Sequence, residues 1–334
     1  MPVIRQPIST KTRIGLGIAS VLVMVAIYTL LSSSRQRAAK QEMVSIAQTR
    51  LEELSTEYAE LDGQLASLGE GEDDPAREAV ETRLTKLAED VDKFTLMRDA
   101  PDKQDRTVPS WSMLYKDGLI RSLSEQGAFK RKEVWLYKDF FATGLRLLVA
   151  LLLGVFVSVV LGLLMGCFDP VDAFFMPPFS FLSKVPATAV LPIFFVIIQI
   201  NFSMYVAIIV FGMLPSLAQA VSASVRKDVP EELVFKAYTL GASQMELIWN
   251  VILRQILPRV LDAIRLQIGP ALVLLVAAEW MVAGEGIGYR LRLFYQRTDM
   301  TVVFVYVVLL GLIGLAVDYG LIWLRRRMCP WFGD

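Results

Sequence analysis

Long stretches without charge are the feature that most constrains how this chain folds. The hydrocarbon core of a membrane is about 30 Å thick, and roughly 20 apolar residues of helix are needed to cross it. The longest stretch has room for two crossings, with a break near Asn201. The sequence therefore predicts an all-α, polytopic membrane protein with about six transmembrane helices. The stretches are residues 14–31, 147–164, 187–225, 266–283 and 301–324, and they contain Glu279 and Asp318 as their only ionisable residues.

The polar segments between these stretches divide the chain into four parts. We expect residues 1–35 to form a cytoplasmic N-terminus with the first span, 36–135 an extracytoplasmic insert, 136–325 the transmembrane core and 326–334 a cytoplasmic tail. The first apolar stretch is too long for a signal peptide, and no convincing cleavage site follows it. We therefore expect it to remain as a transmembrane helix.

Lysines and arginines at the ends of the stretches predict the orientation, because basic residues collect on the cytoplasmic side. They precede the first stretch, follow the last and occur throughout the loop 226–262. Six crossings put these three segments on one side of the membrane, so we expect both termini in the cytoplasm. Arg290, Arg292 and Arg297 do not follow this rule and have no explanation in the sequence.

The polar insert contains two helical repeats whose apolar residues are spaced alternately by three and four, as in the seam of a coiled coil. A glycine-rich, acidic stretch at 69–75 separates them, so we expect an antiparallel helical hairpin over about 43–97. Two interpretations stay open: a docking or gating element for a soluble binding protein or a neighbouring subunit, and a structural spacer. The seam consists of Ala47, Leu51, Leu54, Tyr58, Leu61, Leu65 and Leu68, then Val80, Leu84, Leu87, Val91 and Phe94.

A charged, helix-forming segment, residues 230–265, lies between two of the apolar stretches. Because it is polar, it must lie outside the bilayer, where a soluble partner can reach it. Gly241 sits at its centre, and a glycine between two helical patterns is typical of a turn with a positive φ. Ser243 and Glu246 have the spacing of a capping box, which starts a second helix. The segment therefore predicts a helix, a Gly-Ala-Ser turn and a helix.

This segment resembles the cytoplasmic signature loop of permease subunits of bacterial binding-protein-dependent ABC importers, in the nitrate, sulfonate and taurine group. In that family a Glu-Ala-Ala triplet is followed, after three residues, by Gly and later by an Ile-x-Leu-Pro-like end. Ala237 and the runs 238–243 and 256–261 fit this pattern. Phe235 stands where the family usually has glutamate, and Arg254 where a first proline is usual. Whether these two departures alter coupling stays open.

The resemblance extends from about residue 145 to residue 331 and does not include the hairpin. It implies a type I importer-like permease core in a bacterial inner membrane, working as a dimer, most simply a homodimer. Its implied partners are a separate ABC ATPase and an extracytoplasmic solute-binding protein, besides membrane lipid. The implied solute is small and anionic or zwitterionic. The residues expected to contact the ATPase are Glu231, Glu232, Ala237, Thr239, Leu240, Gly241, Ala242, Ser243 and Gln244.

Polar residues within the spans are candidates for the solute pathway, because such groups are costly in lipid and usually face the protein interior or water. Each also has a structural interpretation. Glu279, which by resemblance precedes a Gly-x-Gly turn, can cap a neighbouring helix or bond to Arg265. Asp318 can pair with Arg146 or with a second subunit. Arg146 can extend its charged end towards the membrane surface. The side-chain amides of Gln199, Asn201 and Gln267 can form interhelical hydrogen bonds. The pathway candidates are Arg146, Gln199, Asn201, Gln267, Glu279 and Asp318.

The absence of a G-x-x-x-x-G-K-[ST] sequence shows that the chain carries no P-loop. We therefore expect no enzymatic activity and no cofactor, with ATP used by a partner subunit. Histidine is absent and Cys167 and Cys329 have no metal-ligand neighbours, so no metal site is expected. A net charge of zero argues against nucleic acid as a partner. Two alternatives stay open: a membrane-anchored sensor or scaffold that uses the coiled coil, and a secondary transporter.

Overall fold

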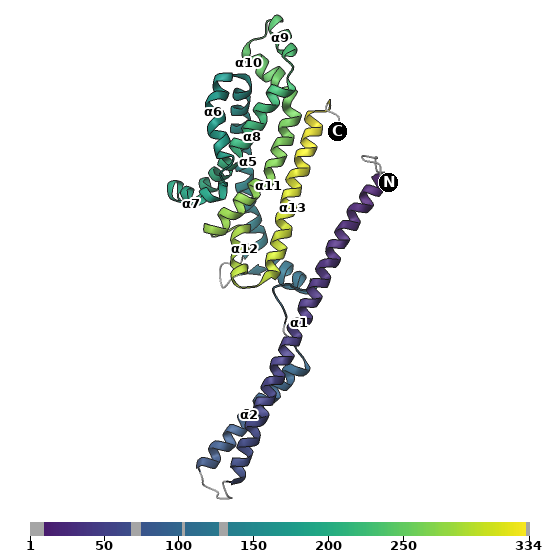
Figure 1. The fold of residues 1–334 in the computed structure, drawn as a ribbon, viewed down its shortest axis with the longest axis vertical. Helices are drawn as coiled ribbons and strands as arrows, with labels where there is room; N and C mark the ends of the chain where they lie inside the picture. Colours follow the sequence, from purple (N-terminus) through teal and green to yellow (C-terminus); the bar gives the residue numbers. More distant parts are fainter. Residues whose placement is uncertain (1–9, 68–74, 102–103, 127–132, 332–334) are drawn as a thin grey trace. The chain divides into compact units, whose positions relative to one another are not determined.

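The computed structural model describes residues 10–67, 75–101, 104–126 and 133–331 (Figure 1). The chain divides into two units, residues 1–115 and 116–334. The first contains α1 (Thr10–Ser67), α2 (Pro75–Asp99) and α3 (Trp111–Met113), and a π-helix, η1 (Leu114–Ile120), leads into the second. The second contains α4 (Arg121–Leu123), β1 (Glu125–Gln126), β2 (Glu133–Val134), α5 (Trp135–Cys167), α6 (Asp169–Leu182), α7 (Ala187–Ile198), α8 (Phe202–Asp228), α9 (Glu231–Thr239), α10 (Gln244–Glu246), the π-helix η2 (Leu247–Ile252), α11 (Leu253–Val282), α12 (Ile287–Gln296) and α13 (Met300–Met328).

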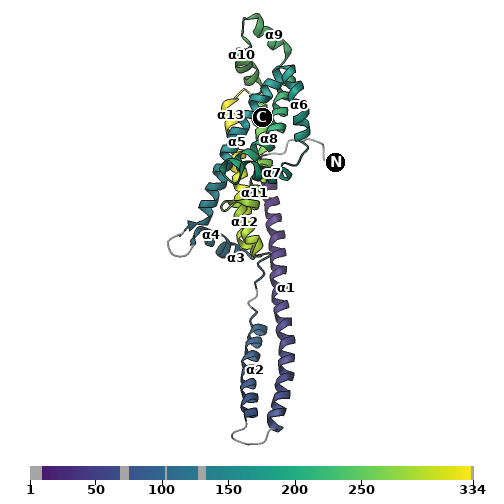
Figure 2. The same ribbon diagram turned by 90° about the vertical axis from the view of Figure 1, so that its left-hand side faces the viewer.

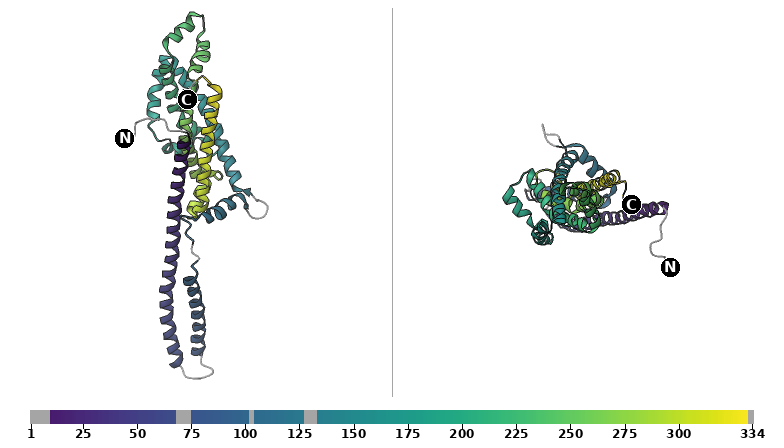
Figure 3. Two further views of the ribbon diagram at one scale, coloured as in Figure 1. Left: turned by 90° about the vertical axis from the view of Figure 1, so that its right-hand side faces the viewer. Right: turned by 90° about the horizontal axis from the view of Figure 1, so that it is seen from above.

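In the first unit, α1 and α2 form the predicted antiparallel helical hairpin (Figures 2 and 3). Ala47 and Leu87 of the predicted seam are buried, whereas Tyr58 is 42% exposed and lies outside it. An ion pair of 2.8 Å between Arg83 Nη2 and Glu57 Oε1 links the two helices. The predicted turn at residues 69–74, and Leu68 with it, lie outside the described residues. The side of the membrane on which the hairpin lies stays a prediction.

The first span and the first arm of the hairpin are one continuous helix, where the sequence analysis treated them as separate elements. α1 has 58 residues, about 87 Å of helix at 1.5 Å per residue, so it extends far beyond a membrane. Residues 32–43 contain no Gly or Pro and are rich in Ala, Arg, Lys and Gln, which favour helix. Nothing in this stretch breaks the helix, so the span continues directly into the arm.

Hydrogen bonds fasten the segment that follows α2 to the middle of α1. The Tyr28 and Ser32 hydroxyls donate to the Pro109 carbonyl, at 2.7 and 2.9 Å. The Gln36 amide donates to the Asp105 carbonyl (2.7 Å) and accepts from the Asp105 N–H (3.1 Å). These bonds fix the base of the hairpin at the end of the first apolar stretch.

In the second unit, α5 and α8 pack closely along a row of small residues (Figure 1). A Cβ on Gly162 would lie 2.7 Å from the Ala218 carbonyl oxygen, and one on Gly166 2.5 Å from Val225 Cβ. Small residues four apart let the backbones of membrane helices approach closely. Sequence reasoning missed this signal, although the spacing is visible in the chain. The row consists of Gly154, Ser158, Gly162 and Gly166.

Of the two crossings predicted in the apolar stretch 187–225, only the second, α8, is a single helix long enough to cross a membrane. The stretch breaks close to Asn201, as predicted, but α7 has 12 residues, about 18 Å of helix, and is too short to cross alone. Instead α7 and α6 form a pair bent by 101°. Among the described residues, five helices are long and apolar enough to cross a membrane, or six if this bent pair counts as one span.

The remaining helices complete a core that is shared by α5, α8, α11, α12 and α13. α10, η2 and α11 form one continuous helix of 39 residues, so the second helix of the predicted polar segment runs directly into a span. The fold class predicted from the sequence, an all-α polytopic protein, is confirmed, apart from the short β1–β2 pair.

Candidate functional site

The polar segment between α8 and α11 folds as the predicted helix, turn and helix, and we call residues 229–252 the elbow. Gly241 has a φ of +83°, which only glycine adopts readily. The Ser243 hydroxyl accepts the Glu246 N–H at 3.3 Å, and the Glu246 carboxylate accepts the Ser243 N–H at 2.9 Å. Both bonds of the predicted capping box are therefore present, and they start the second helix immediately after the turn.

The inner face of the elbow is apolar and closes the two helices onto each other. Leu247 and Ile248 are buried, and Val234 and Ala237 pack against the same core. The Ala242 N–H donates to the Ala237 carbonyl at 3.1 Å, a bond that ends α9 in a tight turn. The elbow is therefore an ordered element that packs its inner face on the common core of the second unit.

The outer face of the elbow presents large apolar side chains, of which the sequence analysis did not single out Met245. Phe235 is 65% exposed, Met245 67% and Leu240 87%. Phe235, one of the two departures from the family pattern, thus adds an apolar side chain to this face. The predicted contact residues Glu231, Glu232, Thr239, Leu240, Gly241, Ser243 and Gln244 are exposed, whereas Ala237 and Ala242 are half-buried.

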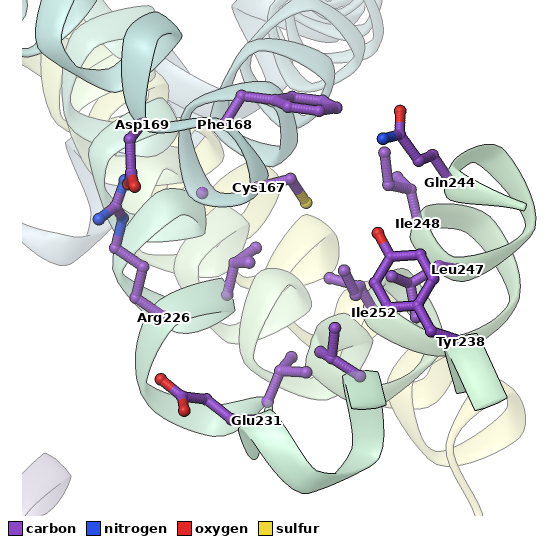
Figure 4. Close-up of a pocket in the computed structure, with 14 residues that line it drawn as sticks. Cys167, Phe168, Asp169, Arg226, Glu231, Tyr238, Gln244, Leu247, Ile248 and Ile252 are labelled. Carbon is purple, nitrogen blue, oxygen red and sulfur yellow. The ribbon is translucent and has the colours of Figure 1, made fainter. Parts of the chain in front are cut away.

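A pocket of about 460 Å³ lies between the elbow and the adjoining ends of α5 and α8 (Figure 4). Tyr238, Gln244 and Ile248 line it on the side of the elbow, and Cys167 and Phe168 on the side of α5. The sequence analysis did not foresee the pocket, because its walls come from segments that are far apart in the chain.

One wall of the pocket is held by the guanidinium of Arg226. It donates to the Met165 carbonyl (3.1 Å) and to the Asp169 carboxylate (3.0 Å), and it lies 3.4 Å from Asp172. The ends of α5, α6 and α8 are thereby tied together, independently of the elbow.

Glu279 of α11 lies at the centre of a fully buried polar cluster near α12. Its carboxylate accepts hydrogen bonds from the Arg146 guanidinium (2.7 Å), the Thr143 hydroxyl (2.9 Å) and the Gly288 N–H (2.9 Å). Of the alternatives left open by the sequence, Glu279 caps a neighbouring helix, α12. The alternative of a bond to Arg265 is not realised, because Arg265 pairs with Asp318.

Arg146 does not snorkel, since its side chain is buried and lies over the Tyr205 ring, with 4.4 Å between the guanidinium carbon and the ring centroid. It faces the protein interior because Glu279 provides a buried counter-charge. Arg146 also donates to the Glu285 carbonyl at 3.1 Å, which ties α5 to the turn before α12.

The Gly-x-Gly turn makes room for the Glu279 carboxylate. Gly286 has a φ of +112°, and a Cβ there would lie 2.7 Å from the carboxylate. A Cβ on Gly288 would lie 2.5 Å from the Val276 carbonyl oxygen. Glycine is therefore required at both positions. At Gly286 both the backbone conformation and the close approach of Glu279 require it, and at Gly288 the close approach of α11 requires it.

A second buried ion pair, which the sequence analysis missed, adjoins this cluster. Arg290 Nε donates to Asp139 Oδ2 at 2.7 Å, and the Tyr306 hydroxyl donates to the same oxygen at 2.9 Å. Arg292 donates to the Met281 and Ala283 carbonyls at the end of α11. Two of the three arginines that broke the orientation rule thus have structural partners.

Asp318 of α13 pairs with Arg265 of α11 through two hydrogen bonds, so its predicted pairing with Arg146 is wrong. Asp262 and Arg325 form a parallel pair between the same helices, at 2.8 and 3.0 Å. The two pairs fasten α11 to α13 on the side of the elbow. Sequence separations of 53 and 63 residues made these partners unrecognisable in advance.

The three candidate amides have different environments. Gln267 accepts a hydrogen bond from the Ser216 hydroxyl at 3.3 Å, an interhelical bond between α11 and α8 as expected. Asn201 caps α8: its side-chain oxygen accepts the Met204 N–H at 3.0 Å, and its amide donates to the Ile198 carbonyl at the end of α7 at 3.2 Å. Gln199 is exposed and has a φ of +63° between α7 and α8.

Within the described ranges, no group of three or more Cys, Asp or Glu side chains is arranged to hold a metal ion.

Comparison with protein families gives one match over more than half of the chain. The family model described as "Binding-protein-dependent transport system inner membrane component" matches residues 150–329. This range includes the elbow, Glu279 and the Gly-x-Gly turn.

Individual relatives match the same part of the chain. The taurine transport system permease protein of Escherichia coli is 28% identical over 199 residues, 60% of this chain and 72% of the relative. A probable ABC transporter permease protein of Brucella melitensis is 31% identical over 59% of this chain and 79% of its own length. The bicarbonate transport system permease protein of Synechocystis is 25% identical over 67% of this chain and 80% of the relative.

Among solved structures, the inward-facing methionine ABC transporter MetNI is similar, with a TM-score of 0.46 and 18% sequence identity over 58% of this chain and 96% of that chain.

Proposed function

Because the chain belongs to the family of binding-protein-dependent transport system inner membrane components, we propose that it is the permease subunit of an ATP-driven importer of a small solute. Its helices would form the translocation pathway in a bacterial inner membrane, and a separate ABC ATPase would supply the energy through residues 230–258. A second permease, most simply another copy, and an extracytoplasmic solute-binding protein would complete the importer. The core would have the type I arrangement.

The geometry of the elbow is the observation that carries this proposal. A soluble motor can drive a membrane protein only through an element that is ordered, accessible and continuous with a span. The elbow packs its inner face on the common core, exposes Phe235, Leu240 and Met245, and passes into α11 without a break. Such exposed apolar side chains on a polar loop are typical of a protein interface.

We further propose that the solute is anionic or zwitterionic. Two relatives are named for taurine, a zwitterion, and for bicarbonate, an anion. Among the pathway candidates, Gln199 and Gln267 are the best placed to meet a solute, since neither is buried in an ion pair. Arg146 and Glu279 neutralise each other inside the core, and Arg265 and Asp318 neutralise each other beside it, so these four residues would support the pathway rather than line it.

Purification from native membranes tests the partnership. A tagged chain should bring down an ATPase with a P-loop, and Glu231→Lys with Glu232→Lys should abolish this, because both carboxylates are exposed in the first turn of α9. Glu52→Lys with Glu60→Lys, a matched change on the exposed surface of α1, should leave it intact. The proposal would be contradicted if the ATPase co-purifies with the variant altered at Glu231 and Glu232, or if no ATPase co-purifies with the unaltered chain.

A further inference from the structure

A π-helix forms the last part of the elbow, where the elbow passes into its membrane span. η2 covers residues 247–252 and lies between α10 and α11 within one continuous helix. π-helices are rare, occur mostly as single turns inside α-helices and are frequent at functional sites. Their hydrogen bonds span one residue more than those of an α-helix, so η2 carries one residue more than an α-helical turn needs.

A pocket lies beside η2 on the side that faces α5. Leu247, Ile248 and Ile252, the buried residues of η2, line this pocket of about 460 Å³, and Cys167 and Phe168 face them from α5 (Figure 4). Because the pocket opens to the surface, it leaves room for η2 and the elbow to move towards α5.

The other connection of the elbow is not helical. Val229 and Pro230 link α8 to α9 in an extended conformation. The helices beyond this link and η2 are tied to one another by ion pairs: Asp228 of α8 with Arg259 of α11 (3.0 Å), and Asp262 of α11 with Arg325 of α13 (2.8 Å). An extended link and a π-helix thus join the elbow to helices that are tied together.

We propose that η2 is a hinge that converts between π- and α-helix when a partner presses on the elbow. Removing the extra residue from the turn changes the register by one residue, which rotates the elbow against α11 by about 100°. The turn at Gly241 and the link at Val229 take up the change in length, and Leu247 and Ile248 move into the pocket. The inference rests on the proposed function, because the partner that presses is the ATPase.

Amide hydrogen exchange on the full chain in nanodiscs tests the hinge without any partner. Residues 247–252 should exchange at least about ten-fold faster than residues 259–264, since local opening of a π-helical turn is easier. Deletion of Asn250, which is exposed, should turn η2 into an α-helix and remove the difference, whereas Asn250→Ala should preserve it. Equal exchange of the two segments in the unaltered chain overturns the proposal, as does a deletion variant that folds and still exchanges rapidly.

A distance measurement tests the movement in the complex and does not depend on the deletion variant. Spin labels on Cys167 and on Tyr238→Cys, with Cys329→Ser, lie on opposite walls of the pocket (Figure 4). Trapping the purified complex with ATP and vanadate should shorten their separation by about 2 Å or more, the scale of interface helix shifts. An unchanged distance with nucleotide trapped overturns the hinge. Failure to recover an ATPase counts against the proposed function, and the exchange experiment then decides the hinge alone.

Discussion

Gly241 shows how a single residue sets the form of the site. Its positive φ turns the chain between α9 and α10, and no other atom lies within 4 Å of the place where a Cβ would stand. A substitution there meets no steric obstacle, so the backbone conformation alone decides which residues the position accepts. Asn tolerates a positive φ, whereas a β-branched residue does not.

We therefore expect Gly241→Asn to preserve ATPase binding and Gly241→Val to weaken it about ten-fold, which corresponds to roughly 1.4 kcal/mol, within the usual range for backbone strain. The measurement is the affinity of the purified ATPase for the permease in nanodiscs. Gly241→Val should also lower the unfolding temperature slightly, because the strain acts on the folded state, whereas Gly241→Asn should leave it nearly unchanged. Equal affinities of the two variants would show that the turn geometry is unimportant.

Glu279 and Arg146 form a buried ion pair in which each charge compensates the other. Both are buried, and the carboxylate has three donors while the guanidinium has a second acceptor in the Glu285 carbonyl. Such a pair adds little net stability compared with apolar residues, but removing one partner leaves an uncompensated charge. Its structural effect is to tie α5, α11 and the start of α12 together.

Glu279→Leu alone should destabilise the protein by about 3–5 kcal/mol, and Arg146→Met alone by a similar amount. The double variant should lose clearly less than the sum of the two, because no unpaired charge is left. Thermal unfolding in detergent, followed by tryptophan fluorescence, measures all four members of this cycle. Additive losses would mean that the two residues act independently.

The row of small residues on α5 acts at the scale of whole helices. Gly154, Ser158, Gly162 and Gly166 bring the backbones of α5 and α8 close together, and lipid cannot replace these contacts, because helix association in membranes depends on packing. Gly144 belongs to the same helix, but no atom lies near its missing Cβ. The two glycines therefore provide a matched comparison.

Gly162→Leu should lower the stability of the second unit by about 1–3 kcal/mol or more, because overpacking forces α5 and α8 apart. Gly144→Leu should have little effect. The unfolding temperature of each variant in the same detergent checks the prediction, and similar losses for both variants would refute the role of the row.

At the scale of the molecule, the two units have different kinds of stability. The second unit buries a common core of α5, α8, α11, α12 and α13 and closes it with two buried ion pairs near α12. The hairpin of the first unit buries few side chains, among them Ala47 and Leu87. Its base is fastened to α1 at Ser32 and Gln36, outside the arms themselves.

We expect replacement of residues 51–91 by a short Gly-Ser linker to leave membrane insertion and ATPase binding unchanged. The described contacts that build the elbow, the pocket and the Glu279 cluster all lie within residues 116–334. Fractionation of membranes and co-purification of the ATPase measure the two properties. Loss of solute uptake with both properties preserved would favour a docking role for the hairpin over a structural spacer.

The sequence by itself determined the features that depend on neighbouring residues. Apolar stretches predicted the five long spans, glycine with a capping box predicted the elbow turn, and the heptad spacing predicted the hairpin. The continuity of α1 was also readable, since residues 32–43 lack helix breakers, but the change from apolar to polar composition at that point suggested a boundary. Each of these signals acts over one or two helical turns.

Only the tertiary structure decided which distant residues meet. Glu279 pairs with Arg146 and Asp318 with Arg265, across 133 and 53 residues, whereas composition allowed other pairings equally well. The same holds for the bent α6–α7 pair, whose path depends on packing against α8, and for the pocket behind the elbow. In each case the free energy comes from burial and charge pairing between segments, which no local pattern in the chain records.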